Sequence, residues 1–145
     1  MRQPHEVLVI VSRGREFLVL HRAPAGGAYW HVVAGGVEPG ESAIDAAARE
    51  LQEETGLETP VADLDRSFVY PLAEETDVVQ ALFSPDVTEV RVDCFSAAAP
   101  AGWEPVLDDE HDDYRWCPPA EAEALLFWPE PREILRGVAA SAGAG

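Results

Sequence analysis

The sequence predicts an α/β domain in which a mixed β-sheet packs against helices. Short β-branched and apolar runs recur along the chain, one strongly helical segment lies between them, and two helical stretches close the sequence. The strands and helices do not alternate regularly, which favours a mixed α/β sandwich over a doubly wound parallel fold. A chain of 145 residues with 47% hydrophobic residues suits one core. We expect a single domain over residues 1–136, followed by a flexible tail over 137–145, where small residues dominate.

The individual elements follow from local patterns. Two apolar runs joined by a Gly-containing turn predict strands at 6–12 and 16–22, and a loop follows at 23–28. A third strand, 29–37, runs into Gly35 and Gly36. Later strands are expected at 65–72, 88–95 and 112–118, the second of them with apolar residues on alternate positions. Prolines suited to a helix start precede the predicted helices at 118–128 and 130–140.

The charge of the chain excludes several classes of partner. Acidic residues number 27 and basic residues 10, giving a net charge of −17. Such a surface repels nucleic acids and anionic membranes, so we expect neither as a partner. No apolar run is long enough for a signal peptide or a membrane span. Two cysteines, Cys94 and Cys117, are expected to be reduced core thiols, which predicts a cytoplasmic protein. The sequence leaves a homodimer open.

The segment between Ser42 and Thr55 has the pattern of a capped helix. Ser42 can cap its start, and Gly56 stands where a left-handed residue would end it. The apolar stripe expected to face the sheet is formed by Ile44, Ala47, Ala48 and Leu51.

Three glutamates crowd the end of this helix. At roughly 100° per residue, Glu50, Glu53 and Glu54 cluster on a second face, about 120° from the centre of the apolar stripe. Like charges four residues apart destabilise an isolated helix by roughly 0.2–0.5 kcal/mol per pair. One interpretation is a solvated acidic face. The other is a site for a divalent cation, with Mg²⁺ as the main candidate, because Gly35 and Gly36 bring backbone carbonyls to the same region.

The segment from Gly35 to Leu57 resembles the Nudix box, G-x5-E-x7-R-E-U-x-E-E-x-G-U, in which U is a bulky aliphatic residue. All of its fixed positions are matched: Gly35, Glu41, Arg49, Glu50, Leu51, Glu53, Glu54, Gly56 and Leu57. The resemblance implies a Nudix-type α/β/α sandwich with a mixed sheet. It also implies hydrolysis of a nucleoside diphosphate linked to a further group X.

The resemblance also implies roles for particular residues. Glu50, Glu53 and Glu54 would bind Mg²⁺, or alternatively Mn²⁺, and the Gly35 or Gly36 carbonyl would add a ligand. Arg49 and Glu41 would hold the catalytic glutamates in position.

Outside the box, the resemblance implies one further carboxylate, acting as a metal ligand or a base. Glu110 is the preferred residue. Three nearby aspartates are alternatives to Glu110, namely Asp108, Asp109 and Asp112. His111 could also serve, although an ordinary surface histidine is the expected interpretation.

Candidate substrate contacts precede the box. Arg22 can reach phosphate, and Tyr29 and Trp30 can stack on a base or a pterin ring. For Trp30, packing beneath the box is the competing interpretation.

A small-molecule nucleotide is therefore the expected substrate. Outside the box, the chain also resembles Nudix enzymes that act on nucleoside or dihydroneopterin triphosphates, which implies a (deoxy)nucleoside or pterin triphosphate cut to a monophosphate and pyrophosphate. The alternatives are a dinucleoside polyphosphate or ADP-ribose hydrolase, and a non-catalytic Nudix module that senses a nucleotide. A prenyl diphosphate isomerase is less favoured, because Cys94 and Cys117 lie outside the positions that it would need.

Overall fold

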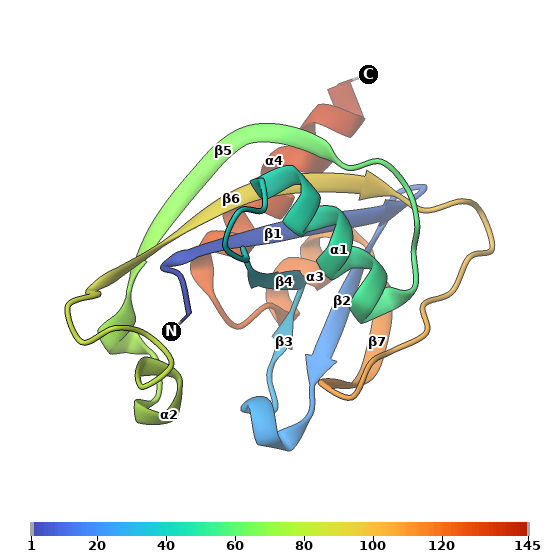
Figure 1. Cartoon of the computed structure of the whole chain (residues 1–145). Coiled ribbons are helices and arrows are strands. Elements are labelled where there is room, and N and C mark those ends of the chain that lie inside the picture. Colours follow the sequence, from blue (N-terminus) through green and yellow to red (C-terminus); the bar gives the residue numbers. More distant parts are fainter. Residues whose placement is uncertain (1, 145) are drawn as a thin grey trace.

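A mixed seven-stranded sheet lies between two helical layers in the computed structural model, which describes residues 2–144 (Figure 1). The strands are β1 (His5–Arg13), β2 (Glu16–Arg22), β3 (Trp30–His31), β4 (Val33–Gly36), β5 (Ala62–Pro71), β6 (Glu89–Ala98) and β7 (His111–Cys117). The helices are α1 (Ala43–Thr55), α2 (Asp77–Gln80), α3 (Pro119–Leu125) and α4 (Pro129–Ala144), with single 3-10 turns at Pro24–Gly26 and Leu72–Glu74. The predicted α/β/α sandwich with a mixed sheet is confirmed.

The sheet is organised around β1. This strand runs parallel to β6, which pairs with β5 on its other side, and antiparallel to β4. β2 pairs with β3 and β7. β1 and β2 pair only beside their turn, at Ser12–Phe17 and Arg13–Glu16. The two strands then diverge, and β4 pairs with the first half of β1, which brings Gly35 into the interior of the sheet opposite Val7.

Side chains of β1 alternate between two cores. Val7, Val9 and Val11 belong to the core that includes residues of α1. Leu8 and Ile10 belong to the core on the opposite face, with residues of α3 and α4. Figure 1 shows α1 in front of the sheet and α4 behind it. Because both faces of the sheet are covered, the middle of β1 is a continuous run of apolar residues.

The C-terminal segment differs from its prediction. α4 continues from Pro129 to Ala144, so the chain is helical beyond Gly137, where the sequence suggested a flexible tail. The reason is packing, because Val138 and Ala139 contact the core beneath α3 and α4. Residue 145 lies outside the described part of the chain.

Smaller differences concern the loops. The strand predicted at 29–37 is interrupted at Val32, giving β3 and β4, and the short helix α2 had no sequence signal. Cys94 and Cys117 are buried and unbonded, which confirms the prediction of core thiols. None of the helices found between residues 2 and 144 has the length and apolar character needed to cross a membrane.

Candidate active site

Both predicted caps of α1 are present. The Ser42 hydroxyl accepts a hydrogen bond from the Asp45 amide at 3.2 Å. At the other end, Gly56 adopts the left-handed conformation with φ 81°, and its amide donates to the Gln52 carbonyl. The helix is therefore fixed at both ends by local interactions, which hold its glutamates in a defined orientation.

The buried face of α1 is rotated from the predicted stripe. Ala46, Ala47 and Leu51 are buried as the sheet-facing residues. Ile44, by contrast, is 44% exposed, and Ala48 is also exposed. The sequence assignment of these two residues to the core is thus wrong. At roughly 100° per residue, the corrected face also contains positions 50 and 54.

This rotation places two glutamates against the sheet. Glu54 is only 2% exposed, and the side chain of Glu50 is 14% exposed. The Glu50 carboxylate rests against the backbone of Gly35 in β4, where a Cβ atom would collide with it. Glycine at position 35 is therefore required by the close approach of α1 to the sheet.

Arg49 holds the surrounding carboxylates in place. Its Nε and Nη2 donate to the two carboxylate oxygens of Glu41, each at 2.9 Å. Nη1 donates to Glu50 at 2.9 Å and to Glu53 at 3.3 Å, and Nη2 also donates to the Gly36 carbonyl at 2.9 Å. The predicted positioning role of Arg49 and Glu41 has a direct geometric basis in this network.

Burial is the largest influence on the pKa values of the two glutamates. Burial, followed by interaction with Glu50, raises the pKa of Glu54 well above its ordinary value. Burial likewise raises the pKa of Glu50, while its contacts with Glu54 and Arg49 oppose the rise. The hydrogen bonds from Arg49 lower the pKa of Glu41. Both shifts disfavour the charged carboxylates, so the pair holds a proton more readily than two isolated glutamates would.

The donor set fits a divalent cation, although it is not a preformed cage. Oε2 of Glu54 is buried without a hydrogen-bond partner. A cation beside it would satisfy this oxygen and relieve the repulsion from Glu50. Glu53, whose side chain is 56% exposed, turns to Arg49 instead. Between residues 2 and 144, no three His, Cys, Asp or Glu side chains are gathered as a metal site. The metal-binding roles of Glu50, Glu53 and Glu54 stay predictions.

A histidine lies beside this pair. His111 is buried, and its Nε2 is 3.6 Å from Oε1 of Glu54. Its Nδ1 lies 2.8 Å from Asp108, which orients the ring. The expectation of a surface histidine is therefore wrong. Glu110 itself is exposed, and its backbone carbonyl accepts a hydrogen bond from the Ala23 amide at 2.9 Å. Its role as base or ligand stays a prediction.

The predicted substrate residues fall on two faces of the sheet. The Arg22 guanidinium carbon lies 5.9 Å from the centre of the Tyr29 ring, and the buried Arg22 Nε has no hydrogen-bond partner. The Trp30 ring instead packs against the core beneath α3 and α4 and contacts His21 and Arg115. Its placement favours the packing interpretation, and a substrate contact stays a prediction.

The sequence interpretation missed His31. Its ring centre is 6.0 Å from that of Tyr29, and its buried Nδ1 has no partner within the described residues. Burial, and then the proximity of Arg22 and His111, lower its pKa to about 3, so the ring is neutral at physiological pH. Period-two alternation from Gly35 through Val33 would have put His31 on the same face as the glutamates.

Comparison with known proteins identifies the family of the chain. The NUDIX domain model matches residues 2–138, and the chain therefore belongs to the NUDIX family.

Two curated relatives share sequence with much of the chain. It is 36% identical over 136 residues to an octanoyltransferase of Myxococcus xanthus, which covers 92% of this chain and 36% of that protein. It is 32% identical over 91 residues to Phosphatase NudJ of Escherichia coli strain K12, covering 62% of this chain and 60% of NudJ. The chain thus spans only part of the length of both relatives.

A solved structure matches over nearly the whole chain. It is that of the E. coli dihydroneopterin triphosphate pyrophosphohydrolase, with a TM-score of 0.83 and 26% sequence identity, and the match covers 97% of each chain. The elements that position Glu50, Glu54 and Arg49 therefore belong to a fold that is shared end to end.

Proposed function

We propose that the protein is a Mg²⁺-dependent pyrophosphohydrolase that cuts a (deoxy)nucleoside or pterin triphosphate to a monophosphate and pyrophosphate. The observation that carries this proposal is the buried Glu50–Glu54 pair, with an unpartnered carboxylate oxygen on Glu54. A buried pair of like charges is costly for folding, and a cation-dependent reaction gives it a purpose. The family to which the chain belongs supports the reaction class.

The cation site would be built on α1. Glu50 and Glu54 would hold Mg²⁺, with Mn²⁺ as a substitute, and Glu53 and the Gly35 carbonyl are further proposed ligands. When bound, the cation supplies charge neutralisation for the phosphates and lowers the pKa of water. Arg49 keeps the Glu50 carboxylate at Gly35, and its contact with Glu53 holds that side chain within reach of the site.

The substrate would approach along the face that carries Arg22. The unpartnered Nε of Arg22 is suited to donate to a phosphate oxygen. Tyr29 lies beside it and offers a flat surface for one ring. Neutral His31 can donate or accept a hydrogen bond without adding charge. These residues bind and orient the triphosphate, and the exposed Glu110 carboxylate is available to accept a proton from the attacking water.

A triphosphate is favoured over larger substrates by two observations. The structural neighbour with a TM-score of 0.83 is named for dihydroneopterin triphosphate. The aromatic side chains next to Arg22 form one cluster, in which Phe127 and Trp128 lie 5.5 and 6.2 Å from Tyr29, ring centre to ring centre. One cluster suits one ring adjoining the phosphate chain.

The test is hydrolysis with GTP and dihydroneopterin triphosphate at fixed Mg²⁺, against a matched sample in EDTA. Pyrophosphate should appear only with Mg²⁺. Thermal unfolding of the same samples gives a readout independent of turnover, because a cation that binds the folded state raises the melting temperature. A shift that is present in wild type and absent in Glu54→Gln would support the site. No shift at millimolar Mg²⁺, together with no turnover of any nucleotide, would contradict the proposal and leave the nucleotide-sensing alternative.

A further inference from the structure

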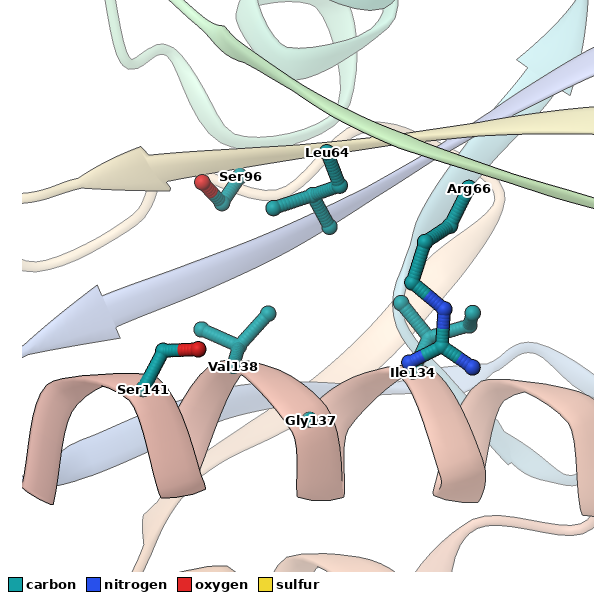
Figure 2. Close-up of a pocket in the computed structure, with 7 residues that line it drawn as sticks. All are labelled: Leu64, Arg66, Ser96, Ile134, Gly137, Val138 and Ser141. Carbon is teal, nitrogen blue, oxygen red and sulfur yellow. The ribbon is translucent and has the colours of Figure 1, made fainter. Parts of the chain in front are cut away.

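A hollow lies on the sheet face opposite α1, between α4 and the strands β5 and β6. It has a volume of about 530 Å³, within the range of small-ligand sites. Figure 2 shows its lining, which consists of Leu64, Arg66, Ser96, Ile134, Gly137, Val138 and Ser141. The sheet separates this hollow from Glu50 and Glu54, since α1 and α4 pack against different cores. It is therefore distinct from the candidate active site.

The charged group in this hollow is Arg66. Acidic residues outnumber arginines by 27 to 10, so ion-pair partners are abundant. Arg136 on α4, for example, pairs with Glu123. Arg66 is an exposed residue of β5 that has no ion pair within residues 2–144, and its guanidinium extends from β5 toward α4 (Figure 2). An unpaired guanidinium beside an apolar wall is suited to bind an anion.

Gly137 makes room for this guanidinium. It lies inside α4, where alanine is the better helix former. A Cβ at this position would come within 2.7 Å of Nη1 of Arg66 and would push the guanidinium away from the helix. Glycine at position 137 therefore allows the Arg66 guanidinium to lie directly against the backbone of α4.

The other residues that line the hollow indicate what the rest of a ligand would contact. Leu64, Ile134 and Val138 form an apolar middle, and the hydroxyls of Ser96 and Ser141 lie at the end away from Arg66 (Figure 2). No aromatic side chain lines the hollow, so stacking on a nucleobase is not available. We propose that this hollow binds a small organic carboxylate with an aliphatic body, its carboxylate on Arg66 and its chain along Leu64 and Val138.

A carboxylate is preferred over other amphipathic molecules for a geometric reason. A planar guanidinium can donate two parallel hydrogen bonds to a carboxylate, whereas an alcohol can accept only in a single-point contact. The net charge of −17 repels anions in general, so binding depends on the local charge of Arg66. This dependence makes the site sensitive to one substitution.

The experiment is titration of ¹⁵N-labelled full-length protein with hexanoate in Mg²⁺-free buffer, followed by amide and arginine side-chain NMR shifts. Hexan-1-ol and hexylammonium serve as neutral and cationic probes of the same length. We expect saturable millimolar binding of hexanoate, with shifts at Leu64, Ser96 and Val138, and at least tenfold weaker binding of both other probes. Arg66→Gln should weaken hexanoate binding at least tenfold, and Arg66→Lys should weaken it less.

Two variants serve as controls. Arg136→Gln removes a neighbouring arginine of α4, and Arg22→Gln removes the arginine proposed for the active site, so neither should change hexanoate binding. The proposal is overturned if hexanoate shows no saturable shifts or if hexan-1-ol binds equally well. It is also overturned if Arg66→Gln binds like wild type, or if the shifts follow Arg22. Because the readout is binding, these results do not depend on whether the protein hydrolyses nucleotides.

Discussion

Single residues carry the chemistry of this molecule, and Glu54 illustrates this best. A carboxylate that is 2% exposed beside a second carboxylate opposes folding, so its presence calls for a compensating ligand. Arg49 cannot be that compensation, because its hydrogen bonds go to Glu41, Glu50, Glu53 and the Gly36 carbonyl.

Replacing Glu54 by glutamine separates stability from activity. Gln keeps the volume and removes one buried charge, so we expect the melting temperature in EDTA to rise by about 3 °C. Turnover with saturating Mg²⁺ should fall by roughly a hundredfold or more, about 2.7 kcal/mol in the barrier. Thermal unfolding and initial rates check the two parts. Glu89→Gln, at an exposed strand position, is the control and should change neither quantity. A variant with turnover within a few-fold of wild type would show that Glu54 is not essential.

Glu110 and His111 compete for the role of base next to the pair. If the exposed Glu110 carboxylate accepts the proton, Glu110→Gln should lower kcat by roughly 10²-fold and leave KM nearly unchanged. His111→Gln should then act mainly on stability, because the ring is buried between Glu54 and Asp108. Steady-state kinetics on both variants distinguishes the two. A kcat loss confined to His111→Gln would transfer the role to the histidine.

His31 predicts a pH dependence of stability. Its folded pKa of about 3 lies below its ordinary value of 6.5, so the unfolded chain binds the proton first. Its contribution is complete above pH 6.5 and is lost as the pH falls toward 3. In His31→Phe, the loss of unfolding free energy between pH 7 and 4.5 should shrink by about 1–2 kcal/mol relative to wild type, after allowing for partial solvent exposure. Urea unfolding of both proteins at the two pH values measures this difference. Equal losses of unfolding free energy in wild type and His31→Phe would argue against a buried neutral ring.

At the scale of whole elements, the sequence predicts where helices form better than it predicts which of their faces are buried. The existence and ends of α1 were predictable, because Ser42 and Gly56 act through local backbone geometry. Its orientation was not, because a hydrophobic pattern assigns Ile44 to the core and glutamates to solvent. The actual packing puts Glu54 inward, which only tertiary contact and a bound charge can justify. Likewise, small residues after Gly137 read as a tail, although packing of Val138 extends α4.

The contact between α1 and β4 can be tested at Gly35. Gly35→Ala would drive a methyl group into the Glu50 carboxylate, and we expect a loss of about 1–3 kcal/mol in stability. The matched control is Gly36→Ala, where the added carbon meets only the flexible end of Arg2 at 3.2 Å. Denaturant unfolding compares the two. The double variant Gly35→Ala/Glu50→Ala should recover part of the loss, since the clashing group is gone. Equal losses at Gly35 and Gly36 would contradict the close approach.

At the scale of the whole molecule, the divergence of β1 and β2 connects the fold to the choice of substrate. It admits β4 beside β1, which seats Gly35 under α1. It also leaves Arg22 at the end of β2, where its amide donates to the Tyr29 carbonyl at 2.9 Å. The proposed cation site and the proposed ring-binding residues are therefore both positioned by one topological feature. The proposal of a triphosphate, which carries its charge beside a single ring, follows from this arrangement.

An HPLC panel at fixed Mg²⁺ tests this match on the intact protein. It should contain ATP, GTP, their deoxy and oxidised forms, dihydroneopterin triphosphate, ADP-ribose and diadenosine polyphosphates. We expect the highest kcat/KM for a triphosphate, with pyrophosphate as the second product, because Arg22 and Tyr29, which lie side by side, are the proposed contacts for the phosphates and one ring. Arg22→Gln should raise KM for triphosphates roughly tenfold, about 1.4 kcal/mol, through loss of a phosphate contact. A tenfold preference for ADP-ribose or a dinucleoside polyphosphate would refute the triphosphate assignment. It would not contradict the proposed metal-dependent reaction at Glu50 and Glu54, because that proposal rests on the carboxylate pair and on the family, and not on the substrate residues.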